Sequence, residues 1–155
     1  MVIACLASSA HAALPSCVTE LPDPVHSEVE VTITPLLAQD DSAIPVSEYA
    51  AVAARLSGIW ARFENCIREV RSCQGTPATS AEEETYRDFL GASARLSAII
   101  RGLEMAIDYK DPELRRRYIQ NRLETGSEDP LDQPPVWDSW RLDYERYIGF
   151  GKGNI

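Results

Sequence analysis

The chain has 155 residues, a formal net charge of −9 and an apolar content of 45%. This length suits one domain with a core of its own. The negative charge argues against general binding to nucleic acids or anionic membranes, because their phosphates would repel it. No apolar run approaches the ~20 residues of a membrane-spanning helix. The acidity favours solubility, and it would also attract a basic protein partner.

Residues 1–12 resemble the end of a secretion signal. Their apolar start is followed by small residues around an Ala10-x-Ala12 cleavage pattern. A complete signal has Lys or Arg and more apolar residues upstream, so we expect the native chain to begin before Met1. The sequence therefore predicts a periplasmic or secreted protein from which this stretch is removed. The box before Cys5 also resembles the one that precedes a lipid-modified cysteine, so a lipid anchor at Cys5 is the alternative.

Residues 13–46 are predicted to form an acidic, proline-rich arm. The segment has five prolines and no Lys or Arg. We expect no long helix here, because proline lacks an amide donor and fixes its own φ. Residues 28–34 alternate apolar and polar side chains, which predicts one short strand with Val29, Val31 and Ile33 on one side. Such a strand would allow a structural subunit to join another chain by strand addition.

Residues 47–155 are predicted to form an all-α domain that begins with an antiparallel helical hairpin. From Ser47, apolar side chains recur at alternating spacings of four and three, namely Val52, Leu56, Ile59, Phe63, Cys66, Val70 and Cys73. This repeat places them on one stripe of a long helix, which residues 74–77 end. A second stripe follows Ser80, where a capping-box pattern starts. Two stripes joined by about six residues favour helices packed side by side.

Two shorter helices are predicted after the hairpin. The first begins at Asp111 as a cap, and it has three consecutive arginines, Arg115, Arg116 and Arg117. These arginines would receive an acidic group, or form a solvated face, or pair with the acidic arm. The second helix is expected over residues 136–148.

The last predicted helix has an aromatic face that suggests two roles. Aromatic side chains recur at helical spacing, and Trp, Tyr and Arg dominate binding energetics, so a partner surface would comprise Trp137, Trp140, Arg141, Tyr144 and Tyr147. The other interpretation is that the aromatic side chains cover the open side of the hairpin as part of the core.

The cysteines predict one disulfide in an oxidising compartment. Cys66 and Cys73 would be ~10.5 Å apart on a continuous helix, whereas a disulfide needs Cα atoms about 4.4–6.8 Å apart. A bond from Cys17 to Cys66 or to Cys73 is therefore favoured. It would close a loop of about 50 residues and contribute ~3–4 kcal/mol in the chain-entropy model.

Few residues suit catalysis or metal binding. Outside the expected signal, His26 is the one histidine, in an irregular segment, so we expect no catalytic triad, no metal site and no cofactor. Acidic side chains are plentiful, and Glu104 and Asp108 lie four residues apart beside the core stripe. A cell-wall or sugar hydrolase with this carboxylate pair is therefore the enzymatic alternative. The favoured interpretation is a non-catalytic exported protein of the inhibitor, immunity or adaptor type that binds another protein.

Overall fold

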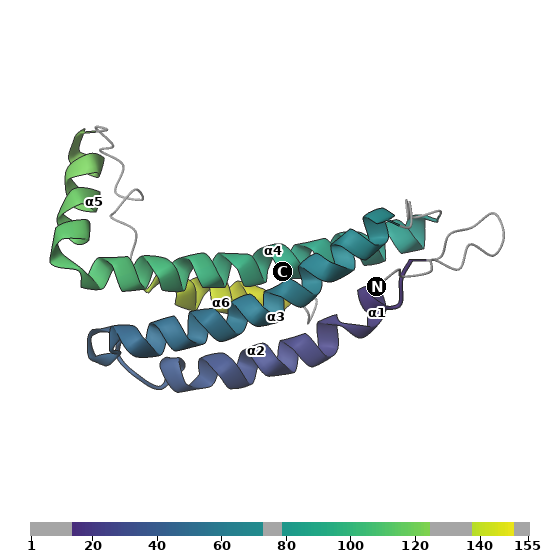
Figure 1. Ribbon diagram of the computed structural model, residues 1–155, viewed down its shortest axis with the longest axis horizontal. Coiled ribbons are helices and arrows are strands. Elements are labelled where there is room, and N and C mark those ends of the chain that lie inside the picture. The colour runs from purple at the N-terminus through teal and green to yellow at the C-terminus, as the bar shows by residue number, and fades with distance from the viewer. Residues whose placement is uncertain (1–13, 73–78, 125–137, 151–155) are drawn as a thin grey trace.

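The computed structural model describes residues 14–72, 79–124 and 138–150, and these ranges are all-α, as predicted (Figure 1). Their elements, in chain order, are α1 (Cys17–Glu20), α2 (Pro22–Leu37), the 3₁₀ helix η1 (Asp41–Ala43), α3 (Val46–Ser72), α4 (Ser80–Lys110), α5 (Pro112–Glu124) and α6 (Ser139–Phe150). None of these described helices is long and apolar enough to cross a membrane.

The long helices lie alongside one another in a bundle (Figure 1). Helices α3 and α4 run in opposite directions, α2 packs on α3, and α6 packs on α4. Helix α5 differs from the rest, because the chain turns sharply after α4 and α5 projects away from the bundle. One end of the bundle therefore has a corner between α4 and α5.

The strand predicted over residues 28–34 is wrong, because this stretch lies inside α2. The buried side chains of α2 follow helical spacing and not alternation: Val25, Val29, Thr32, Ile33 and Leu36. Val31, which the strand would have placed beside Val29 and Ile33, is 68% exposed. The Thr32 hydroxyl donates to the carbonyl of Glu28 at 2.7 Å, so its polar group is satisfied within the helix. No backbone edge for strand addition is present at 28–34.

The expectation that prolines exclude a long helix from residues 13–46 is also wrong. Pro22 and Pro24 lie in the first turn of α2, where backbone amides have no partner within the helix. Pro35 lies in the last turn, where it removes only one hydrogen bond close to the end. All three prolines therefore occupy positions that a helix of this length tolerates.

The core is one continuous cluster to which every long bundle helix contributes. The stripe predicted on α3 is buried at Leu56, Ile59, Phe63, Cys66 and Val70. Phe63 contacts Phe89 of α4 at 5.0 Å between ring centroids, which joins the two long helices. The acidic segment packs as part of the bundle, since α2 adds its buried side chains to the same cluster.

A disulfide joins Cys17 of α1 to Cys66 of α3, with Cα atoms 6.0 Å apart. The sequence left Cys66 and Cys73 as alternatives for Cys17, and the structure has the bond to Cys66. The two cysteines are 49 positions apart in sequence, and the bond fixes the start of the described chain to the C-terminal part of α3. Cys5 and Cys73 lie outside the described residues.

Glycine 102 allows α6 to approach α4 closely. A Cβ atom at Gly102 would lie 2.9 Å from the Cα and 3.0 Å from the Cβ of Trp140. Backbone atoms cannot turn aside as a flexible side chain can, so a larger residue would push α6 away from α4. The two helices therefore depend on the absence of a side chain at this position.

Replacing glycine with alanine tests this packing. We expect Gly102→Ala to lower the free energy of unfolding by about 1–3 kcal/mol, because the added methyl overlaps the backbone of α6. Gly58→Ala on α3 is the matched control, since a Cβ there meets nothing within 4 Å, and it should stabilise by up to about 1 kcal/mol through helix propensity. Urea denaturation measures both. Equal effects of the two substitutions would contradict this packing.

Candidate functional site

The corner between α4 and α5 contains a cavity of about 320 Å³, which we call the corner site. It is lined by Asp41, Ser42, Tyr49, Ala106, Tyr109, Lys110 and Arg115. These residues come from η1, α3, α4 and α5, so four elements have to be placed correctly to form it. The short turn at η1 places Asp41 and Ser42 in this site.

Asp40 fixes the turn that begins η1. Its carboxylate accepts hydrogen bonds from the amide and the hydroxyl of Ser42, at 2.9 and 2.8 Å. These bonds lower the pKa of Asp40, because they favour its charged form. An aspartate that bonds the amide two residues on is a common way to close such a turn. The turn directs the next residue, Asp41, into the protein, where it is 7% exposed.

The buried Asp41 carboxylate accepts hydrogen bonds from three side chains. The hydroxyl of Tyr49 and Nε1 of Trp140 donate to Oδ1, the latter at 3.0 Å. Nε of Arg141 donates to Oδ2 at 2.7 Å and also supplies the opposite charge. A carboxylate removed from water is costly unless it is paired and hydrogen-bonded, and here both conditions are met. We call these four side chains the Asp41 network.

Arg141 extends this network to the end of α2. Its Nη2 donates to the backbone carbonyl of Gln39 at 2.6 Å and to that of Leu36 at 3.4 Å. The last carbonyls of a helix have no partner within the helix, so an arginine at this place satisfies them. One guanidinium therefore joins α6, η1 and the C-terminus of α2.

Tyr49 remains a hydrogen-bond donor over a wide range of pH. Burial raises the pKa of its phenol, and the hydrogen bond to Asp41 raises it further. The neutral phenol can donate, whereas a phenolate beside Asp41 would repel it. The ring of Trp140 meets that of Tyr49 edge-on, with centroids 6.4 Å apart.

Two cations face the corner site. Lys110, at the end of α4, donates from Nζ to the backbone carbonyls of Asp41 at 2.7 Å and of Ser42 at 3.3 Å. Arg115, in the first turns of α5, lies over the ring of Tyr109 at 5.9 Å. Neither cation has an ion pair with a carboxylate in the described ranges. The Asp41 carboxylate is already occupied, so the charge that the corner site offers to a ligand is positive.

The direction of α5 is set by its own N-terminal cap. The carboxylate of Asp111 accepts from the amide of Glu113 at 2.8 Å and of Leu114 at 3.3 Å, which confirms the predicted cap. Further along, Arg116 and Arg117 pair with Glu113 at 2.8 and 3.3 Å. Pairing within α5 was not among the roles considered for the three arginines, and both Arg116 and Arg117 stay more than half exposed, as on a solvated face.

The predicted aromatic surface lies mostly inside the protein. Trp140 is 0% and Tyr147 3% exposed, and both belong to the core. Arg141 pairs with Asp41, and Tyr144 is partly buried against the same core. Trp137 lies outside the described residues. A partner could reach Trp140 or Tyr147 only if α6 left the bundle, so these side chains act in packing here.

The predicted carboxylate pair does not face a shared cavity. Glu104 is exposed in a groove between α3 and α4, whereas Asp108 is partly buried one turn further along α4. The second acid in the groove with Glu104 is Glu64 of α3.

His26 packs as an aromatic residue. Its ring stacks on that of Tyr147 with centroids 5.6 Å apart, and its Nε2 is buried without a partner in the described part of the chain. A search of the described residues finds no cluster of three or more His, Cys, Asp or Glu side chains that could hold a metal ion.

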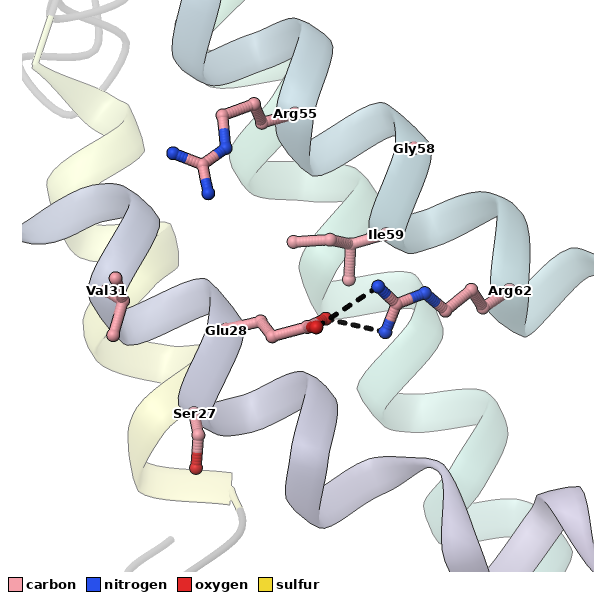
Figure 2. Close-up of a pocket in the computed structure, with 7 residues that line it drawn as sticks. All are labelled: Ser27, Glu28, Val31, Arg55, Gly58, Ile59 and Arg62. Atoms are coloured by element: carbon pink, nitrogen blue, oxygen red, sulfur yellow. Dashed lines mark hydrogen bonds and ion pairs between the residues drawn. The ribbon is translucent and has the colours of Figure 1, made fainter.

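Figure 2 shows another groove, of about 480 Å³, between α2 and α3. Glu28 of α2 reaches across it to Arg62 of α3, with bonds of 2.6 and 3.1 Å. This pair is about half-exposed, so it contributes at most about 1 kcal/mol. Val31, Arg55 and Gly58 provide an aliphatic surface with one cation. Fewer polar groups converge here than at the corner site.

Comparison with protein-family models, with curated proteins and with solved structures finds no match for this chain.

Substitution of neighbouring aspartates tests the Asp41 network. We expect Asp41→Asn to lower the free energy of unfolding by about 3 kcal/mol, because it leaves Arg141 without its buried counter-charge and places an amide among donors. Asp40→Asn is the control, and it should have a much smaller effect because asparagine caps a turn as well as aspartate. Thermal and urea unfolding measure the difference. A similar loss from both substitutions would show that Asp41 has no special role.

Proposed function

We propose that this chain is a non-catalytic exported protein that binds a protein partner through α5 and the corner site. The observation that carries the proposal is the position of α5, which stands away from the bundle (Figure 1). An isolated helix of 13 residues is only marginally stable in water, and its residues would gain stability from a partner.

The exposed residues of α5 suit a protein interface. Leu114 is the one partly buried side chain among those that the structure describes on this helix. Ile119 is 40% exposed, and Arg115 and Arg116 lie four and three residues before it, about one helical turn away on the same side of α5. Arginine is enriched among the residues that contribute most to protein interfaces. These features support a surface with an aliphatic centre and a basic rim.

The charge of this surface supports an acidic partner segment. Lys110 and Arg115 extend the basic surface of α5 into the corner site, although the whole chain has a net charge of −9. A carboxylate entering the corner site would meet two cations that have no carboxylate partner in the described residues. The acidity of residues 13–46 would instead suit a basic partner. Because α2, which contains much of this acidic segment, packs in the bundle, we propose the basic corner site as the surface that binds the partner.

Export is supported by the Cys17–Cys66 disulfide. Such bonds persist in oxidising compartments, such as the periplasm or the outside of a cell. The signal-like residues 1–12 agree with export, although they lie outside the described residues.

A capture experiment with matched variants tests the proposal. The protein is expressed from its full native gene, with any sequence upstream of Met1, in its native host with a C-terminal tag, and proteins bound to it are isolated from the extracytoplasmic fraction. We expect a stoichiometric partner that the triple variant Arg115→Ala, Arg116→Ala, Arg117→Ala binds about tenfold less tightly or worse, because it lacks the basic surface.

The control removes the same charge elsewhere. The triple variant Arg55→Ala, Arg71→Ala, Arg87→Ala changes three exposed arginines of α3 and α4 and should keep the partner. Circular dichroism checks that both variants fold. Equal binding by the two variants would refute the role of α5, and recovery of the chain from the cytoplasm alone would refute export.

A further inference from the structure

The groove between α3 and α4 that contains Glu104 has features of a ligand site separate from α5. Its volume is about 510 Å³, within the usual range of about 300–1,000 Å³ for small-molecule sites. Trp60, Glu64 and Arg68 lie one turn apart along α3, and Arg101 and Glu104 face them from α4. Five side chains from two helices thus converge on one open groove.

These side chains have unused hydrogen-bonding capacity. Within the described ranges, Glu64, Glu104 and Arg101 form no hydrogen bond or ion pair, and Arg68 donates only to the neighbouring Asn65, at 2.8 Å. The positive charge of Arg101 favours the charged form of Asp143. The burial of Asp143 has the larger effect, so the pKa of Asp143 is raised. Glu64 and Arg68 are four residues apart and Arg101 and Glu104 three, which are spacings at which opposite charges on a helix can pair, as Arg116 and Glu113 do here. The groove therefore has donors and acceptors that are free to bind a ligand.

Trp60 provides the groove with an aromatic surface. Its indole Nε1 is buried and has no hydrogen-bond acceptor in the described residues. An indole nitrogen can only donate, so its burial without an acceptor is costly. The ring is only partly buried and lines the groove, where it offers an aromatic surface beside the charged groups. The exposed part of the ring, and not the buried Nε1, is what a ligand in the groove can contact.

The charge and the chemistry of the groove select one class of ligand. Two glutamates and two arginines give no net charge, so a strongly charged ligand would meet as much repulsion as attraction. Sugar hydroxyls donate and accept at once, which matches carboxylates, guanidinium groups and the hydroxyls of Ser57 and Ser97. The C–H face of a sugar ring is apolar and can pack on an indole. We propose that the α3–α4 groove binds a neutral oligosaccharide.

Titration with defined trisaccharides tests the proposal. The probes are maltotriose, cellotriose and triacetylchitotriose, with trigalacturonate as an acidic analogue. Tryptophan indole N–H signals are followed by NMR, and the Trp60 signal is assigned from Trp60→Phe. At least one neutral trisaccharide should shift this signal in a saturable way and bind about tenfold more tightly than trigalacturonate.

Variants decide whether binding occurs in this groove. By calorimetry, Glu104→Gln and Trp60→Ala should each weaken binding about tenfold, because the first removes a charged acceptor and the second the aromatic surface on which a sugar ring would pack. Glu145→Gln changes an exposed acid of α6 and should have no effect. Circular dichroism confirms that the variants are folded. The proposal is overturned if no neutral trisaccharide shifts the Trp60 signal, if only trigalacturonate binds, or if Glu104→Gln binds as the unmodified chain does.

Discussion

The burial of the Asp41 carboxylate is the constraint on which this end of the molecule depends. A charge removed from water needs an opposite charge and several donors, and here these come from α3 and α6, with Lys110 of α4 bonded to the Asp41 carbonyl. Arg141 also satisfies the last carbonyls of α2. The position of each helix end is thus linked to that of the others, and the loss of one partner leaves polar groups buried without bonds.

This arrangement also determines what the protein can present to a partner. The aromatic side chains Trp140 and Tyr147 of α6 close the bundle, so the partner surface that we propose lies on α5 and at the corner site. Lys110 connects the two regions, because it bonds the η1 backbone and lies next to Arg115 in the same cavity. The result is a basic corner on an acidic protein, and such local contrast favours one orientation of a charged partner.

Much of the helical structure follows from local patterns, whereas the site does not. The seven-residue stripes of α3 and α4 and the cap at Asp111 can be read directly from the sequence. Residues 28–34 fit two patterns, because Val29 and Ile33 share a face in a strand and in a helix, and only packing decides against the strand. Asp41 could not be identified, because Trp140 and Arg141 are 99 and 100 residues away. The one local pattern near this site is the Asp40–Ser42 turn, in which an aspartate bonds the amide two residues on.

Hydrogen exchange of the Trp140 indole N–H tests the central role of Asp41 most directly. If this N–H donates to the buried carboxylate as described, it can exchange only when the end of the bundle opens. The account predicts that the Trp140 indole N–H exchanges orders of magnitude more slowly than that of an exposed indole, at a rate set by global unfolding of the protein. Exchange as fast as that of an exposed tryptophan would contradict it.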